Sequence, residues 1–238
     1  MNQTDNPRVA IITGASQGIG AGLVSAFRSA GYAVVGTSLS IRPSEAPDFL
    51  TLQGDIAQIE TAQRVVQQAL DRFGRIDSLV NNAGIYIGKP FIDYTADDFV
   101  AITAVNLAGF FHITQRAVRP MIAQGGGHVV NVTTSLVDHA DSRRPSALAS
   151  LTKGGLAAVT RSLAIEYASR GVRVNAVALG VIRTPIHDAA SYAGMASLHP
   201  LGRIGEISDV VDGIMYLERA PFVTGEILHI DGGQAAGR

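Results

Sequence analysis

The stretch TGASQGIG, residues Thr13–Gly20, decides the fold, because it joins a short apolar run to a helical pattern. Gly14 permits a tight turn, Gly18 lets the backbone approach a pyrophosphate, and Gly20 lets the helix pack against a sheet. Free N–H groups and the positive dipole end of that helix would face the phosphates. A turn without a ligand explains one glycine but not three at this spacing. The stretch therefore predicts a dinucleotide-binding turn after the first strand.

Short apolar runs alternate with longer helical patterns along the whole chain. Most of these runs are continuously apolar, which is typical of parallel strands buried on both faces. The alternation predicts an α/β fold, a doubly wound parallel seven-stranded sheet of Rossmann type, in a single domain over residues 1–238. The expected strands are RVAIITG (8–14), AVVGTS (33–38), FLTLQGD (49–55), DSLVNNAG (77–84), GHVVNVTT (127–134), VRVNAVAL (172–179) and EILHIDGG (226–233).

The helical patterns have recognisable starts and apolar faces. Thr95 and Asp98 are spaced for a capping box that opens a helix running through Asn106 to Met121. A second long helix is expected over about 146–169. One-sided apolar stripes at helical spacing are formed by Ala62, Val65, Val66, Ala69, Leu70 and Phe73, and by Thr152, Leu156, Val159 and Leu163.

Composition excludes several classes of function. The chain has 19 basic and 20 acidic side chains and a net charge of −1, so no nucleic-acid or anionic-membrane partner is expected. It has no cysteine, and its six histidines show no metal-binding spacing, so no metal is expected. The first residues are polar, and no run of about 18 apolar residues is present. We therefore expect a cytoplasmic protein.

Further segments complete the pattern: GDI, NNAG, VNLAGFF, TKGG, RVNAV, RTP and TGEILHIDGG. Together with TGASQGIG they occur in the order found in the short-chain dehydrogenase/reductases, which the chain resembles over about residues 8–233. It is most similar to ketoreductase-like members, including the 3-oxoacyl-carrier-protein reductase type. The resemblance implies an NAD(P)-dependent oxidoreductase that moves a hydride between nicotinamide and a carbonyl or secondary alcohol. It also implies a homotetramer.

The resemblance implies roles for individual residues. Lys153 would bind the nicotinamide ribose hydroxyls, and Asn106 would bend its helix and hold a proton-relaying water. Asp55 and Ile56 would lie at the adenine edge, and Thr184 would contact the nicotinamide amide or phosphate. The other residues implied to contact the dinucleotide are Gly14, Ser16, Gln17, Gly18, Ile19, Gly20, Asn82, Ala83, Gly84, Gly180 and Ile182.

One family residue is missing. The family has Tyr four residues before its Lys, on the same helical face, where the Lys lowers the phenol pKa and the phenol exchanges a proton with substrate. Here that position is Ala149. The serine that binds the substrate carbonyl corresponds to Thr134 counted from Asn131, or to Ser135 counted back from Ala149. A second departure is Leu179, where the family usually has Pro.

Several groups are candidates for the missing acid. They are Asp138 and His139 after the fifth strand, Tyr192 in the following lid-like segment, and Lys153 acting through a water in the space beside Ala149. Two other interpretations remain open. The protein could be a non-catalytic dinucleotide-binding sensor or partner subunit, or Ala149 could be an engineered knock-out of an ordinary enzyme.

The end of the second predicted strand bears on the choice between NAD and NADP. NAD-specific proteins usually carry an acid there to bind the ribose 2′-hydroxyl, and this chain has Ser38 instead. Ser38, Ser40 and Arg42 could bind a 2′-phosphate. The two arginines common in NADP-binding relatives are replaced by Gln17 and Leu39. The sequence favours NADP over NAD on balance.

Overall fold

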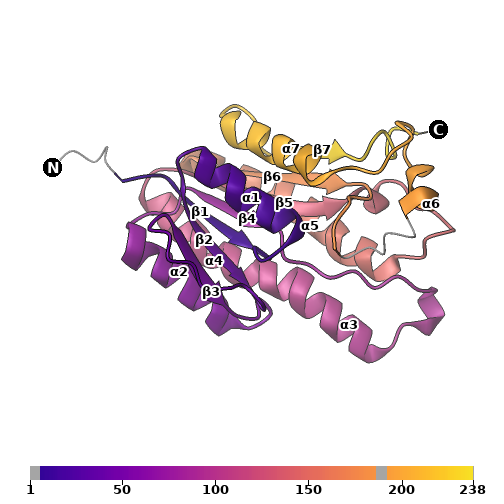
Figure 1. The fold of residues 1–238 in the computed structure, drawn as a ribbon, viewed down its shortest axis with the longest axis horizontal. Coiled ribbons are helices and arrows are strands. Elements are labelled where there is room, and N and C mark those ends of the chain that lie inside the picture. Colours follow the sequence, from indigo (N-terminus) through magenta and orange to yellow (C-terminus); the bar gives the residue numbers. More distant parts are fainter. Residues whose placement is uncertain (1–5, 186–191, 238) are drawn as a thin grey trace.

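Seven parallel strands form one sheet in the order β3-β2-β1-β4-β5-β6-β7 (Figure 1). The computed structural model describes residues 6–185 and 192–237, with side chains from residue 194 in the second part. All seven predicted strands are confirmed. The strands are β1 Val9–Thr13, β2 Ala33–Ser38, β3 Phe49–Gln53, β4 Ser78–Asn81, β5 Gly127–Thr134, β6 Val172–Leu179 and β7 Ile227–Ile230.

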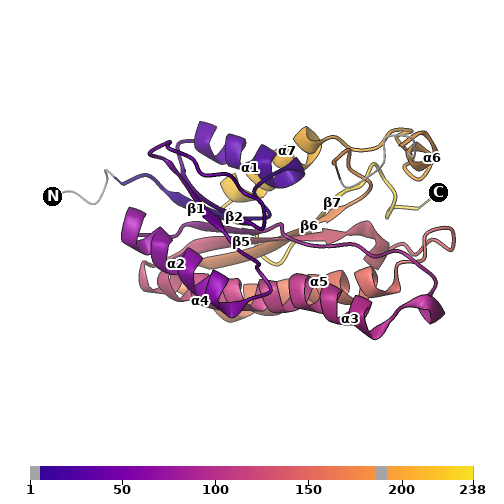
Figure 2. The ribbon, with the colours of Figure 1, turned by 60° about the horizontal axis from the view of Figure 1, so that its bottom comes forward.

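Helices cover both faces of the sheet, so the fold is doubly wound as predicted (Figure 2). The side chains of β1 point alternately to the two faces. Val9 and Ile11 pack against α2, α4 and α5, and Ala10 and Ile12 pack against α1 and α7. The helices are α1 Gly18–Ser29, α2 Ile59–Phe73, α3 Ala96–Thr103, α4 Phe110–Ala123, α5 Ala147–Tyr167, α6 Tyr192–Ala196 and α7 Ile207–Arg219, with short turns η1 Phe91–Asp93, η3 Ser135–Val137 and η4 Ala168–Arg170.

The helix predicted to start at Thr95 is confirmed and contains an irregular turn. The Thr95 hydroxyl accepts from the Asp98 amide at 3.1 Å, and the Asp98 carboxylate accepts from the Thr95 amide at 2.8 Å. The helix then runs through a π-helical segment, η2 Ala104–Gly109, before it continues as α4. The π turn contains Asn106, and π turns of this kind often lie at functional sites.

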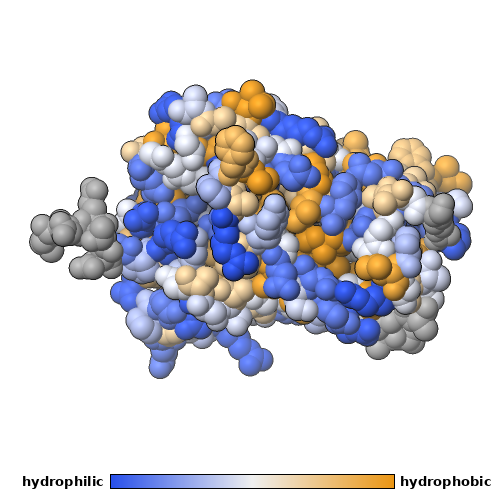
Figure 3. Space-filling view, turned by 90° about the horizontal axis from the view of Figure 1, so that it is seen from above, coloured by the Kyte–Doolittle hydropathy of each residue, from blue (hydrophilic) through white to orange (hydrophobic). Residues whose placement is uncertain are grey.

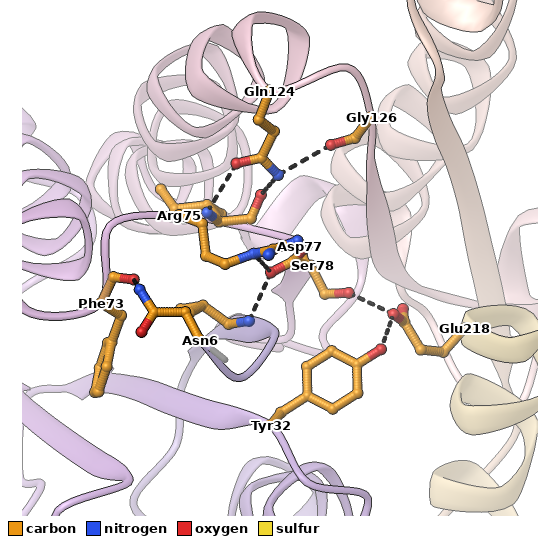
Figure 4. A network of polar contacts seen from close by, with 11 residues as sticks. Asn6, Tyr32, Phe73, Arg75, Asp77, Ser78, Gln124, Gly126 and Glu218 are labelled. Carbon is orange, nitrogen blue, oxygen red and sulfur yellow. Dashed lines mark hydrogen bonds and ion pairs between the residues drawn. The ribbon is translucent and has the colours of Figure 1, made fainter. Parts of the chain in front are cut away.

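A buried carboxylate connects α7 to the amino-terminal edge of the sheet. Glu218 accepts hydrogen bonds from the Tyr32 and Ser78 hydroxyls, each at 2.7 Å (Figure 4). It also accepts from His128 Nδ1 at 2.7 Å, while His128 Nε2 accepts from Asn175 at 3.0 Å. Asn175 is held in that orientation by the backbone of Glu226 and Val223. His128 is therefore neutral, with its proton on Nδ1.

The pKa values at this carboxylate follow from its partners. Burial by itself raises the pKa of Glu218, but hydrogen bonds from His128, Tyr32 and Ser78 outweigh it and lower the pKa to about 2. Burial lowers the pKa of His128, against the attraction of Glu218. The Glu218 carboxylate stabilises the folded state near neutral pH, and both groups make the fold less stable as the pH falls, because the unfolded chain binds their protons more readily.

The surface mixes hydrophilic and hydrophobic side chains, as Figure 3 shows for one face. Among described residues, exposed hydrophobic side chains include Phe111, Leu151 and Ile165 on α4 and α5. The continuous helix Ala96–Ala123 has 28 residues, and its most apolar window, of mean hydropathy 1.2, would be long enough to cross a membrane. Core helices of soluble proteins meet the same criterion, and this helix packs Ile102, Ile113 and Met121 into the core.

Glu218→Gln should destabilise the fold by roughly 3 kcal/mol at pH 7, because it removes a buried carboxylate from three donors. The folded pKa of about 2 lies below the ordinary value of 4.5, so this contribution is present above about pH 4.5 and is lost as the pH falls toward 2. Urea unfolding at several pH values measures both effects.

The control is Glu226→Gln, which removes an exposed carboxylate and should change stability by less than about 0.5 kcal/mol. If the Glu218 variant lost no more stability than this control at pH 7, the buried network would not stabilise the fold.

Candidate active site

One large cavity, of about 460 Å³, lies at the carboxyl edge of the sheet. It brings together residues that are far apart in the sequence and that the sequence predicted as one site. Of those, the residues that line it are Gly14, Ser16, Gln17, Gly18, Ile19, Ser38, Asp55, Ile56, Asn82, Ala83, Gly84, Thr134, Ser135, Lys153, Gly180, Ile182 and Thr184. The predicted residues Gly20, Arg42 and Asn106 do not line it.

The glycine turn has the geometry that its sequence predicted. Gly14 and Gly18 have φ angles of +67° and +54°, in the region that favours glycine. A Cβ on Gly20 would lie 2.0 Å from the Gly14 carbonyl oxygen, so only glycine allows α1 to approach the turn. Gly20 therefore shapes the site from behind. Across the turn, a Cβ on Gly18 would lie 3.7 Å from Thr184 and Pro185, so the segment after β6 covers the turn.

Asn82 ties β4 to the end of β1. Its side-chain amide donates to the carbonyls of Thr13 at 2.9 Å and Gly14 at 3.3 Å. The Thr13 hydroxyl in turn accepts from the backbone amides of Asn82 and Ala83, at 3.1 and 2.9 Å. These bonds hold the glycine turn beside the loop that follows β4.

Of the three residues expected to bind a 2′-phosphate, Ser38 and Ser40 line the cavity and Arg42 does not. Ser38 lines the cavity, and the hydroxyls of Ser40 and Ser16 lie 3.3 Å apart across its rim. Arg42 is exposed and lies outside the cavity lining, whereas its neighbour Ile41 is buried in the core. Asp55 lines the cavity and also accepts from the Ala57 amide at 2.9 Å, so it caps its own turn.

Lys153 extends from α5 into the cavity. Its Nζ donates to the Val132 carbonyl at 2.7 Å, and burial lowers its pKa to about 8. A Cβ on Gly84 would lie 3.0 Å from Nζ, so the glycine of NNAG leaves room for the ammonium group. The cation is thereby fixed between β5 and the loop after β4.

Asn106 supports the cavity from below. Its Oδ1 accepts from the Ile85 amide at 2.9 Å, and its Nδ2 donates to the Ile85 carbonyl at 3.1 Å and to the Thr152 hydroxyl at 3.2 Å. The π turn aims this buried side chain at the loop after β4 and at α5 together. Its direct effect is to position Ile85 and the residue next to Lys153.

Ala149 lines the cavity four residues before Lys153, where the family has its Tyr. Nearby, Ser135 Oγ lies 3.2 Å from the Leu179 carbonyl and 3.1 Å from the Gln234 side chain. Thr134 Oγ1 lies 3.3 Å from the same Leu179 carbonyl. Both hydroxyls line the cavity, so both remain candidates for binding a substrate oxygen.

The candidate replacements for the Tyr fare differently. Asp138 pairs with His229 at 3.0 Å, and neither it nor His139 lines the cavity. The side chain of Tyr192 lies outside the described part of the chain. Among these candidates, Lys153 is the one that the structure brings to the space beside Ala149.

Several cavity residues were missed by the sequence patterns. Tyr86, Arg144 and Gln234 line the cavity, but they belong to loops without a periodic pattern. Position alone could have found Tyr86, which follows Gly84 by two residues. Nothing in the sequence marks Gln234 or Arg144, because their approach depends on how the loops fold over the sheet.

His199 is a further residue that the patterns missed. Its Nδ1 lies 2.7 Å from the Asp231 carbonyl, and its Nε2 accepts from the Val181 amide at 3.3 Å. A Cβ on Gly180 would lie 2.6 Å from His199 Cε1. The histidine therefore fixes the segment after β6 where the family usually has Pro instead of Leu179.

Comparison with known proteins agrees with this geometry. The protein-family profile described as Enoyl-(Acyl carrier protein) reductase matches residues 14–235. A 3-oxoacyl-(acyl-carrier-protein) reductase of Thermotoga maritima is 33% identical over an alignment that covers 95% of this chain and 97% of that protein.

Two similar solved structures hold dinucleotides. ElxO with NADP bound has a TM-score of 0.90 at 28% identity, over 97% of this chain and 100% of that one. The 3-ketoacyl-(acyl-carrier-protein) reductase from Brucella melitensis, complexed with NADH, has a TM-score of 0.87 at 28% identity, over 96% and 98% of the two chains. The chain belongs to the short-chain dehydrogenase/reductase family, whose members are NAD(P)-dependent oxidoreductases.

Proposed function

We propose that this protein is an NAD(P)-dependent oxidoreductase that interconverts a carbonyl and a secondary alcohol, with an active site that has lost the family's Tyr. The observation that carries the proposal is that one cavity joins the glycine turn to Lys153, Ser135 and Thr134. The residues present fit a dinucleotide, because the positive-φ glycines leave a cradle that a Cβ would obstruct. When bound, the nicotinamide ring supplies or accepts the hydride.

The chain's own residues would handle the proton. Lys153 is the cation beside the Ala149 space, and its pKa of about 8 makes it a competent donor near neutral pH. Ser135 or Thr134 would donate a hydrogen bond to the substrate oxygen and polarise it. A water between Lys153 and that oxygen would carry the proton across the space a phenol would fill.

The dinucleotide is proposed to be NADP rather than NAD. Ser38 and Ser40 at the cavity rim carry no charge that would repel a 2′-phosphate. A structural neighbour with NADP bound supports this choice, and a neighbour with NADH supports the alternative. Arg42 would have to turn toward the rim to contribute.

A non-catalytic dinucleotide-binding protein is the second candidate function. It is favoured by Ala149, because a positioned general acid typically accounts for about 10²–10⁴ in rate. The cavity and glycine turn suit both candidates, since both need the dinucleotide.

The remaining properties are proposed from the family and from the surface. The protein would be a cytoplasmic homotetramer acting on a small carbonyl or alcohol, without a nucleic-acid or membrane partner. Phe111, Leu151 and Ile165 expose 54, 57 and 80% of their surface on α4 and α5. Such side chains are better accommodated in a subunit interface than in water.

Gly18→Val should abolish dinucleotide binding, with affinity falling at least about 100-fold, because a β-branched residue resists a positive φ and fills the pyrophosphate space. Calorimetric titration with NADP and NAD measures this, and the natural protein should bind NADP more tightly.

The matched control is Gly31→Val, since Gly31 has a φ of +82° and open space around it, away from the cavity. Equal loss of binding in both variants would mean that backbone strain alone is responsible. Tenfold tighter binding of NAD than NADP would overturn the choice of cofactor.

Ala149→Tyr should raise carbonyl reduction by about 10²–10⁴-fold, equivalent to about 3–5 kcal/mol of barrier, because it restores a phenol one helical turn before Lys153. The measurement is NADPH and NADH oxidation against a broad carbonyl panel, with dinucleotide affinity checked in each form.

Ala149→Phe is the control, because it adds the ring without the hydroxyl and should give no gain. In the natural protein, reduction should slow as the pH rises through about 8, since the donor is lost when Lys153 deprotonates. If neither the natural protein nor the tyrosine variant reduced any carbonyl while both bound dinucleotide, the non-catalytic function would be correct.

The protein should have a mass near 100 kDa in solution, four times the 24.9 kDa chain. Multi-angle light scattering measures this directly. Ile165→Asp should weaken the assembly, because it places a charge in the expected interface, and a natural protein of about 25 kDa would refute the proposed tetramer.

A further inference from the structure

Arg144 is a cation in the cavity lining that forms no ion pair with a carboxylate in the part of the chain that the structure describes. The charged residues among those lining the cavity are Asp55, Lys153 and Arg144. Asp55 belongs to the turn after β3, and Lys153 is engaged with Val132. Arg144 lies on the loop between η3 and α5, and no ion pair is formed by its guanidinium with the described residues.

The neighbouring Arg143, in contrast, is paired with a carboxylate and exposed to solvent. Arg143 pairs with Asp141 at 2.8 Å, leaves 56% of its side chain exposed, and does not line the cavity. The loop thus neutralises one of its two adjacent arginines and directs the other inward. A solvated surface cation would not be expected to occupy a mainly apolar cavity without a counter-charge.

Tyr86 lies beside Arg144 at the same part of the cavity. Burial raises the pKa of Tyr86, and the nearby guanidinium of Arg144 opposes that effect. Tyr86 follows Gly84, which lies next to the Lys153 ammonium, and Arg144 precedes Ala149 on the loop that enters α5. Tyr86 is therefore carried by the loop that contacts the Lys153 ammonium, and Arg144 by the loop that leads into the helix of Lys153.

We propose that Arg144, with the Tyr86 hydroxyl beside it, binds an anionic group of the substrate and so selects carbonyl compounds or alcohols that carry a carboxylate or a phosphate. This inference rests on the proposed oxidoreductase function. The guanidinium presents a planar fork of donors that matches either oxyanion. The same cavity is also lined by the apolar residues Leu136, Ile85 and Pro185, and apolar surroundings strengthen such an attraction.

The first experiment compares substrates that differ in charge alone. NADPH oxidation is measured with 4-oxopentanoate against 4-oxopentanamide, and with dihydroxyacetone phosphate against dihydroxyacetone. In at least one pair, the natural protein should have a kcat/KM at least about tenfold higher for the charged member than for the neutral one. The pair in which this preference appears identifies whether the site binds a carboxylate or a phosphate. Arg144→Gln should abolish that preference, because the charged member loses the guanidinium that binds it.

Arg143→Gln is the matched control, and it should keep the preference. Arg144→Lys should keep part of it, because it retains the charge without the fork, and it also guards against a folding defect in the glutamine variant. Equal rates on charged and neutral members in the natural protein would overturn the inference while leaving the proposed function standing.

A second readout does not need turnover. With NADP present, glutarate and inorganic phosphate are tested for protection against thermal unfolding, with glutaramide as the neutral probe. Protection by an anion that disappears in Arg144→Gln but not in Arg143→Gln supports the anion site, even if no carbonyl is reduced and the proposed function fails. Absence of protection by either anion, together with no charge preference in turnover, overturns the site.

Discussion

The hydrogen bonds that join Asn82 to the end of β1 are the constraint on which the rest of the site depends. The side-chain amide of Asn82 donates to the Thr13 and Gly14 carbonyls. The Thr13 hydroxyl accepts from the backbone amides of Asn82 and Ala83. The backbone pairing of β1 with β4 ends at Ile12 and Val80. These side-chain bonds continue the connection, and so they set the glycine turn at a fixed distance from the loop after β4.

The loop after β4 is in turn connected to α5, on the other side of the cavity. Its backbone at Ile85 is held by Asn106, which the π turn directs inward and which also binds Thr152 on α5. Gly84 leaves room for the Lys153 ammonium, which is then held by Val132. Three elements are thereby connected through buried side chains, and this arrangement persists without a tyrosine at position 149. The contacts that hold Lys153 in place therefore do not depend on the tyrosine that relatives carry four residues before their lysine.

The opposite edge of the sheet is stabilised differently. There the buried Glu218 gathers donors from the starts of the strands and from the segment before β2, and it connects them to α7. A charge buried with three hydrogen-bond donors stabilises only while all its partners are in place. The amino-terminal edge of the sheet is thus held together by a buried charge. The carboxyl edge is built of turns and loops, and ligands of parallel sheets bind at this edge.

The sequence by itself determined the seven strands, the capped helix at Thr95 and the glycine turn, because each depends on local periodicity or on the conformational freedom of glycine at a turn. Motif order further indicated most of the cavity lining. Only the tertiary structure decided that Arg42 and Asp138 point elsewhere, that His199 holds the segment after β6, and that Tyr86, Gln234 and Arg144 reach the cavity. The physical reason is that a loop residue's direction depends on packing between distant segments, which leaves no periodic trace in the chain.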